Sequence, residues 1–233
     1  MSELFSIQLQ NRQQQGRDGV WLDLPTTTEQ VQAALRQIGI SSDNPQGLFI
    51  SGYFAEEEKR FAIPYNMVLA SNVDELNFLA SRLETLSTGE RTELNAALQA
   101  PQSELFSIGR ITDFPENVDY YVHLPDVHGP AQLGDYYLNR SGMVDMPEEW
   151  KGGIDTAQFG RYVAQQEQGV FTEYGYLVKS GDAWQKVHEG QPVPEEYRVL
   201  SFPFLRRKFC EIRPTSRHLF SLKRNRRKLF PLS

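Results

Sequence analysis

The chain has 233 residues, of which 39% are hydrophobic, and this content is enough for folded cores and excludes a wholly disordered protein. The single cysteine, Cys210, excludes a disulfide framework within the chain and a zinc site built on cysteines. The first residues lack the basic and apolar regions of a signal peptide, and no apolar stretch approaches the roughly 18 residues that span a bilayer. We therefore expect a cytoplasmic protein that does not enter a membrane.

The net charge of −6 conceals two parts of opposite sign. Residues 1–200 contain 29 acidic and 14 basic side chains, a net charge of −15, whereas residues 201–233 contain one acidic and ten basic side chains, a net charge of +9. Such asymmetry informs about partners rather than about fold. The basic tail, 201–233, could contact nucleic acid or anionic lipid, or fold back on the acidic body. We favour a disordered or recently acquired extension.

The first 60 residues predict a small β-β-α-β unit. Residues 4–10 alternate between apolar and polar side chains, as a half-buried strand does, and residues 20–24 form the returning strand. Thr26 and Glu29 have the spacing of a capping box, which predicts the start of a helix. A third strand is expected over residues 47–54.

The next 40 residues predict a helical hairpin. Ser71 with Asp74 predicts the cap of one helix, and Ser87 with Glu90 predicts the capping box of a second helix that ends before Pro101. Apolar residues follow the helical period in both segments.

Mixed structure is expected again between residues 117 and 180. Strands are predicted over residues 118–124, 169–171 and 174–178, and helices over residues 131–139 and 154–166. In the second of these helices the apolar stripe that we expect to face inward consists of Ile154, Phe159, Tyr162 and Val163. The whole pattern indicates the α+β class, with a mixed N-terminal unit, a central helical unit and a mixed third unit.

Motifs of catalysis and cofactor binding are weak in this sequence. His123, Asp126 and His128 fall within six residues, but their spacing matches no metal-binding pattern, and Pro125 and Gly129 favour a surface turn. The sequence has no phosphate-binding loop, no dinucleotide fingerprint and no nucleophile elbow. We therefore expect no catalytic residue, no metal and no cofactor.

The acidic side chains are the feature most indicative of a partner. Carboxylates three or four residues apart on a helix lie about 5–6 Å apart, close to the spacing of successive phosphates in DNA. Residues 104–149 are the densest stretch, with nine acidic and two basic side chains. The candidate partner-binding acids are Glu56, Glu57, Glu58, Asp74, Glu75, Glu84, Glu90, Glu93, Glu104, Asp113, Glu116, Asp119, Asp126, Asp135, Asp145, Glu148, Glu149 and Asp155.

Three stretches, in order along the chain, resemble the ArdA antirestriction family. They are residues 19–25, residues 74–80 with the helix that follows, and residues 136–161. The last stretch is the most specific, because it ends in a run similar to a characteristic family segment. The residues that carry this likeness are Ile154, Asp155, Ala157, Phe159, Gly160 and Arg161.

The resemblance implies an elongated, non-catalytic protein that imitates bent B-form DNA and occupies the DNA-binding groove of type I restriction–modification enzymes. Family members are carried by mobile elements and form homodimers through their third domain. The implied domains are residues 1–63 (α+β), 64–112 (helical) and 113–182 (α+β, dimerising), followed by an extension over residues 183–233. The acidic body is not expected to bind DNA itself.

Two other functions remain open at this stage. An acidic adaptor could use the same face to bind another basic DNA-binding partner. An enzyme could use His123 and Asp126, for example in hydrolysis, although nothing in the sequence positions them.

Overall fold

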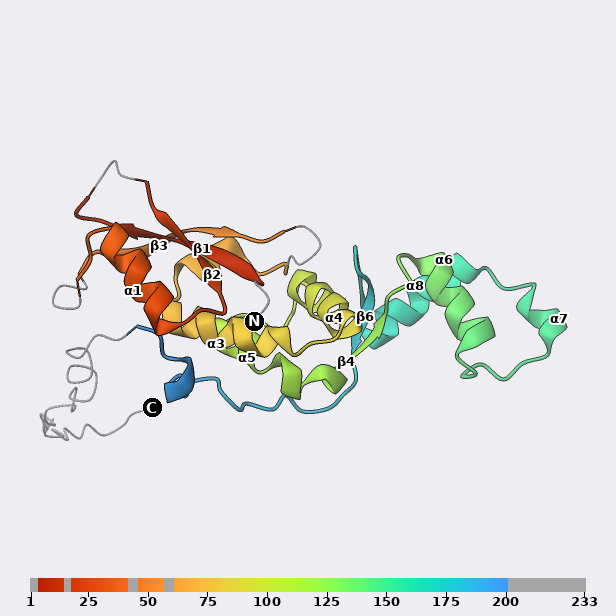
Figure 1. Ribbon diagram of the computed structural model, residues 1–233. Coiled ribbons are helices and arrows are strands. Elements are labelled where there is room, and N and C mark those ends of the chain that lie inside the picture. Colours follow the sequence, from red (N-terminus) through yellow and green to blue (C-terminus); the bar gives the residue numbers. More distant parts are fainter. Residues whose placement is uncertain (1–3, 15–17, 42–45, 57–60, 201–233) are drawn as a thin grey trace, which may run out of the picture. The chain divides into compact units, whose positions relative to one another are not determined.

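The structure, a computed structural model, describes residues 4–14, 18–41, 46–56 and 61–200 (Figure 1). By contacts between residues, the chain divides into Met1–Ser201 and Phe202–Ser233. The basic tail therefore lies outside the described residues, as do Glu57 and Glu58 of the predicted acidic set. Short antiparallel sheets combined with helices confirm the α+β class. The division at residues 63, 112 and 182 stays a prediction.

The first sheet is antiparallel with the strand order β2-β1-β3. Its elements, with the helix that packs beside them, are β1 (Phe5–Asn11), β2 (Val20–Leu24), α1 (Thr28–Gln37) and β3 (Leu48–Phe54). Alternation along the central strand places Phe5, Ile7 and Leu9 on one face, where each is at most 1% exposed. Val31 and Leu35 of α1 are equally buried, so this face of the sheet is the core of the first unit.

The cap of α1 lies one residue later than the sequence predicted. Thr27 and Gln30 form the capping box, not Thr26 and Glu29. Thr26 is buried, and its backbone N–H donates to Oδ1 of Asn77 at 2.7 Å. This hydrogen bond connects the end of β2 to the helical region and leaves Thr27 as the N-cap.

The helical region consists of four helices, α2 (Tyr65–Leu69), α3 (Val73–Glu84), α4 (Thr88–Gln99) and α5 (Ile108–Thr112). Leu76, Leu79 and Leu83 of α3 have no exposed surface, as expected for an apolar stripe at helical spacing. Ser87 and Glu90 form the predicted capping box of α4. The predicted cap of α3 was wrong by one residue.

The actual cap of α3 is Asn72, and Glu75 completes its box. The hydroxyl of Ser71 instead donates to the carbonyl of Met67, one turn back in α2. The carboxylate of Asp74 accepts hydrogen bonds from a distant part of the chain, as described below.

The third region begins with two 3-10 turns and contains a second antiparallel sheet of order β4-β6-β5. Residues 118–120 form one of these turns, so the strand predicted over 118–124 begins only at Tyr121. The elements are η2 (Phe114–Glu116), η3 (Val118–Tyr120), β4 (Tyr121–Leu124), α6 (Pro130–Asp135), the π-helical turn η4 (Tyr136–Arg140), α7 (Glu148–Lys151), α8 (Thr156–Glu167), β5 (Val170–Thr172) and β6 (Gly175–Lys179).

Helices α6 and α8 approach each other through two glycines. A Cβ atom on Gly160 would lie 1.8 Å from the carbonyl oxygen of Pro130, and one on Gly134 would lie 1.9 Å from that of Thr156. Gly160 is buried, whereas Tyr162, predicted to face inward, is 60% exposed. The close contact of the two backbones turns α8 so that its Gly160 side, and not Tyr162, faces α6.

Residues 183–200, here called the strap, return from the second sheet to the helical region (Figure 1). They contain one short turn, η5 (Glu195–Tyr197), which contacts α3. The ring of Tyr197 packs on Phe78 of α3 at 4.7 Å between centroids, and the indole of Trp184 packs on Tyr120 at 5.1 Å. The strap is thus part of the folded body.

We predict that Gly160→Ala lowers the free energy of unfolding by about 3 kcal/mol, because a methyl group there collides with backbone that cannot move aside. Chemical denaturation followed by circular dichroism measures the loss. Gly89→Ala in α4 is the matched control, since nothing lies within 4 Å of a Cβ there, and it is expected to be neutral or slightly stabilising. Equal unfolding midpoints for Gly160→Ala and the parent protein would contradict the prediction.

Candidate functional site

The candidate acids divide into three groups by burial. Asp113 is fully buried. Eight acids are half-buried, namely Asp74, Glu75, Glu84, Glu90, Glu93, Glu104, Glu116 and Asp135. Seven are exposed, namely Glu56, Asp119, Asp126, Asp145, Glu148, Glu149 and Asp155.

Asp113 anchors the strap rather than facing solvent. Its two carboxylate oxygens accept hydrogen bonds from the backbone N–H groups of Val187, His188 and Glu189, at 3.3, 2.6 and 3.2 Å. Its exposed fraction is 0%. A carboxylate enclosed in this way cannot contact a partner, so we leave Asp113 out of the candidate surface.

Asp74 and two asparagines hold the rest of the strap in the same manner. Oδ1 of Asp74 accepts the N–H groups of Val199 and Leu200, each at 2.8 Å. Burial raises the pKa of Asp74, while these two hydrogen bonds lower it in part. Asn77 donates to the carbonyl of Tyr197 at 3.0 Å, and Asn117 both donates to and accepts from the backbone of Gln185.

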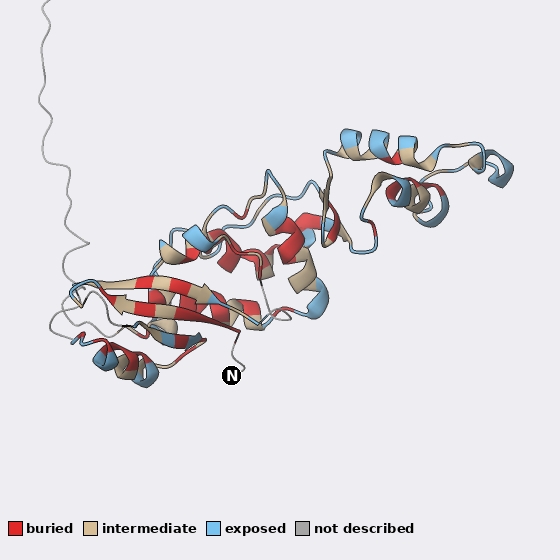
Figure 2. Ribbon diagram, turned by 90° about the horizontal axis from the view of Figure 1, so that it is seen from above, coloured by how far each residue is buried: buried red, intermediate tan, exposed pale blue. Residues whose placement is uncertain are grey.

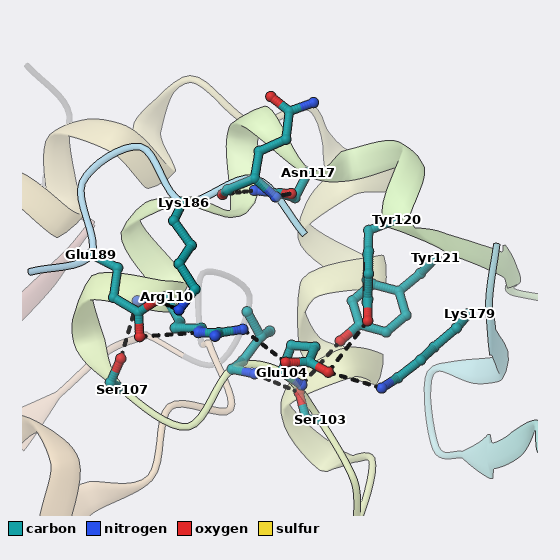
Figure 3. A network of polar contacts seen from close by, with 12 residues as sticks. Ser103, Glu104, Ser107, Arg110, Asn117, Tyr120, Tyr121, Lys179, Lys186 and Glu189 are labelled. Carbon is teal, nitrogen blue, oxygen red and sulfur yellow. Dashed lines mark hydrogen bonds and ion pairs between the residues drawn. The ribbon is translucent and has the colours of Figure 1, made fainter. Parts of the chain in front are cut away.

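Glu104 belongs to a network of paired charges around the buried Arg110 (Figure 3). The guanidinium donates to Glu104 at 2.7 Å and to Glu189 of the strap at 3.1 Å. Lys179 donates to the other oxygen of Glu104 at 3.0 Å, and this contact is the main reason that the pKa of Glu104 is lowered. Glu104 is therefore neutralised within the fold.

Other acids act on nearby backbone or on cations. Glu116 forms a close ion pair with Arg82 of α3. Glu75 and Glu90 complete capping boxes, and Asp155 caps α8 by accepting the N–H of Gln158 at 3.0 Å. A cap at these positions stabilises its helix by about 1 kcal/mol, and since the exposed carboxylate of Asp155 still faces solvent, capping does not prevent it from meeting a partner.

Glu90, Glu93 and Asp119 form a small group of like charges where α4 approaches η3. Burial, and then the negative charges of Glu90 and Asp119, raise the pKa of Glu93 to about 8. Oε1 of Glu93 is buried and has no hydrogen-bond partner in the described part of the chain. At neutral pH, Glu93 is thus largely protonated and contributes little charge.

Acids that face solvent are concentrated in the segment between η4 and α8. Asp145, Glu148 and Glu149 are exposed, and the last two lie in the first turn of α7, where the helix dipole stabilises negative charge. Figure 2 shows this segment and the outer side of α8 mainly in the colours of intermediate and exposed residues, whereas most residues of β1 and α3 are buried. The segment presents Trp150 to solvent as well, 69% exposed.

The residues that carry the resemblance position α8. Gly160 makes the contact with α6, and Asp155 caps the helix. Ile154, Ala157 and Phe159 are half-buried, and Arg161 is exposed. Four of these six residues are therefore buried or half-buried and contribute to the packing of α8, whereas Asp155 and Arg161 face solvent.

The segment with His123, Asp126 and His128, for which the sequence favoured a surface turn over a metal site, is half-buried or exposed at these three positions. Nε2 of His123 is 2.8 Å from the carbonyl oxygen of Tyr174, while Asp126 and His128 are exposed. In the described ranges, Asp113, Glu116 and His188 place potential ligand atoms within 4.8 Å of one another. The oxygens of Asp113 already accept backbone N–H groups, and Glu116 pairs with Arg82, so we assign no metal to this group.

Sequence reasoning missed the strap and the groups that hold it. A polar, proline-containing segment has no periodicity from which packing could be read. The contacts of Asp113 and Asp74 with the strap join residues 74 to 126 positions apart, and no local pattern encodes such pairs.

None of the helices in the described residues is both long and apolar enough to cross a membrane. A family model described as "Antirestriction protein (ArdA)" matches residues 15–178 of the chain. None of the curated proteins matches the chain. The matched region includes the helical region, both glycines of the α6–α8 contact and the exposed acids near α7, and it ends before the strap.

We predict that Asp113→Ala lowers the free energy of unfolding by about 3 kcal/mol or more, because three N–H groups of the strap lose their buried acceptor. The control is Asp119→Ala, which removes an equal charge from an exposed site and is expected to change stability by less than about 0.5 kcal/mol. Denaturant titration compares the two. Similar stabilities for the two variants would show that Asp113 does not anchor the strap.

We predict that Glu93→Gln flattens the dependence of stability on pH. The folded pKa of about 8 lies above the unfolded value of 4.5, so folded Glu93 retains a proton that the unfolded chain releases. The contribution of Glu93 to the stability of the parent therefore falls as pH rises from 4.5 to 8. At pH 9 the variant should be more stable than the parent, by on the order of 1 kcal/mol after solvent screening.

Thermal unfolding between pH 5 and pH 9 measures this difference, with the exposed Glu149→Gln as control. The variant and the parent should coincide near pH 5. A difference that does not depend on pH would contradict the prediction for Glu93.

Proposed function

The chain belongs to the ArdA family of antirestriction proteins, and from this we propose that it imitates DNA and occupies the DNA-binding groove of a type I restriction–modification enzyme. The family match over residues 15–178 is the observation that carries the proposal. In this proposal the protein acts by binding and not by catalysis, in the cytoplasm where the enzyme meets incoming DNA.

The exposed acids near α7 support the proposal on physical grounds. A DNA-binding groove gains affinity by replacing the counterions of phosphates with its own Lys and Arg side chains. Carboxylates that face solvent can replace those phosphates, whereas carboxylates paired inside the fold cannot. Asp145 and Glu149 form no ion pair in the described part of the chain, and Glu148, 81% exposed, has only the i,i+3 partner Lys151.

Some of the eighteen predicted acids fit this role poorly. Asp113 and Asp74 hold the strap, Glu104 is paired with Arg110 and Lys179, and Glu93 is largely protonated at neutral pH. We propose that the mimicking surface comprises mainly the exposed set, namely Glu56, Asp119, Asp126, Asp145, Glu148, Glu149 and Asp155, together with half-buried acids at helix starts such as Glu75 and Glu90.

We also propose that the protein acts as a homodimer formed through its third region. Large apolar side chains are exposed there, namely Met143 at 76%, Trp150 at 69% and Tyr162 at 60%. Burying such side chains is the usual driving force of protein association. A dimer of the acidic body would carry twice the charge of one copy and so extend the DNA-like surface.

We predict that the variant Asp145→Asn, Glu148→Gln, Glu149→Gln inhibits a type I restriction–modification enzyme about tenfold or more weakly than the parent, because three phosphate-like charges are lost. DNA cleavage and methylation are measured over a titration of the purified protein. The control is Asp182→Asn, Glu195→Gln, Glu196→Gln, which removes three exposed charges outside the matched region.

Added salt should weaken inhibition by the parent, and it should weaken inhibition by the α7 variant less steeply, since fewer charges take part. Unchanged cleavage and methylation at micromolar parent protein would reject the proposed function. If the two triple variants lose inhibition equally, the loss reflects net charge in general, and the assignment of the partner-binding surface to the acids near α7 is rejected.

A further inference from the structure

A cavity of about 520 Å³ lies where the strap crosses the helical region. Its walls come from α2 and α3 on one side, from the start of α5 on another, and from residues 188–193 of the strap. This volume is within the range of sites that hold small ligands or inserted side chains. Asp113 and Asp74 are among the residues that hold the strap in place over this cavity.

The lining combines aromatic surface with negative charge. Phe78, Phe106 and Ile108 contribute apolar surface, and Glu75 and Glu189 contribute carboxylates. None of the described residues that line the cavity is Lys or Arg. Such a lining favours a ligand with an apolar stem and a positively charged end.

The two carboxylates differ in how far the fold already uses them. Glu189 pairs through Oε1 with Arg110 at 3.1 Å, and its Oε2 is buried, with an exposed Lys186 at 3.4 Å and no hydrogen bond within the described residues. Glu75 accepts one long hydrogen bond of 3.3 Å from the N–H of Asn72, and in the described part of the chain it forms no ion pair with Lys or Arg. Glu75 is thus the principal charge for an incoming cation.

Phe106 shows that guanidinium binding is compatible with this environment. Its ring is 62% exposed, and the guanidinium carbon of Arg110 lies 4.6 Å from the ring centroid. The stacking of a planar cation on an aromatic face is therefore already present at the edge of the cavity.

We propose that this cavity is a docking site for an arginine side chain presented by the protein's basic partner. This inference rests on the proposed function, since a DNA-binding groove is lined with Lys and Arg side chains that normally meet phosphates. In the complex, one arginine of the partner would insert into the cavity instead of pairing with an exposed carboxylate on the surface. The guanidinium would pair with Glu75 and pack on the aromatic lining.

A direct binding experiment tests the cavity without the restriction enzyme. N-acetyl-arginine amide is titrated into the full chain while the NMR signals of the His188 ring, which lines the cavity, are followed. N-acetyl-citrulline amide is the matched neutral probe. We expect saturable shifts in the millimolar range with the arginine probe, and much weaker shifts with the citrulline probe and with Glu75→Gln.

The control for Glu75→Gln is Glu90→Gln. Both residues occupy the third position of a helical capping box, and glutamine retains the box in each case, but only Glu75 lines the cavity. Because Glu90 lies outside the cavity, Glu90→Gln should leave the probe-induced shifts of the His188 ring as they are in the parent. Equal binding of the arginine and citrulline probes, no binding of either, or equal effects of the two variants would overturn the inference.

A second experiment asks whether the cavity takes part in inhibition. Ala70→Phe fills the cavity from its rim without changing charge, and Ala131→Phe places the same ring on an exposed site of α6. We expect Ala70→Phe, and not Ala131→Phe, to weaken inhibition of a type I enzyme about tenfold, the effect of losing one central contact.

The two proposals fail in different ways. If the parent inhibits the enzyme but Ala70→Phe and Ala131→Phe inhibit it equally, the docking site is rejected and the proposed function stands. If the parent does not inhibit but binds the arginine probe in a Glu75-dependent manner, the proposed function is rejected while the cavity retains its specificity for a guanidinium.

Discussion

The hydrogen bonds between the buried carboxylate of Asp113 and three successive N–H groups of the strap are the interaction on which much of this structure depends. A carboxylate with no exposed surface needs hydrogen-bond donors around it, and here three N–H groups of the strap supply them. That attachment brings Glu189 to Arg110 and completes the charge network of Figure 3. It also supplies one wall of the cavity beneath the strap.

An acidic protein of this kind must therefore divide its carboxylates between two tasks. Those that are buried against the chain's own N–H groups, or paired with its cations, stabilise the fold, and they cannot also meet a partner. Those left in solvent repel one another and lower the stability of the fold. Their presence is consistent with a function that uses the negative electrostatic field they create. Asp113 and Glu104 belong to the first group, and Asp145 and Glu149 to the second. Net charge alone does not separate the two.

Local patterns in the sequence predicted the fold well where the structure itself is local. Strand alternation and the box at Ser87 and Glu90 depend on neighbouring residues, and they were confirmed. The cap predicted at Thr26 was wrong because a buried bond to Asn77, 51 positions away, takes that residue inward. Tyr162 was predicted inward because an apolar stripe does not reveal that a glycine makes the helix contact. The roles of individual acids depended in the same way on partners distant in sequence.

Two of the motif residues that resemble the family, Gly160 and Asp155, have roles in the fold itself. Gly160 lies within α8 at the point where no side chain fits between two backbones, and Asp155 caps the start of the helix by accepting the N–H of Gln158. Neither task fixes how many carboxylates surround α8 or where they point. The requirements of the fold and those proposed for the partner therefore act on largely separate positions, with Asp155 serving both, so the scaffold does not by itself determine the surface charges. The match establishes the family of this protein, and under the proposed function the strength of its binding depends on the acids that the scaffold leaves in solvent.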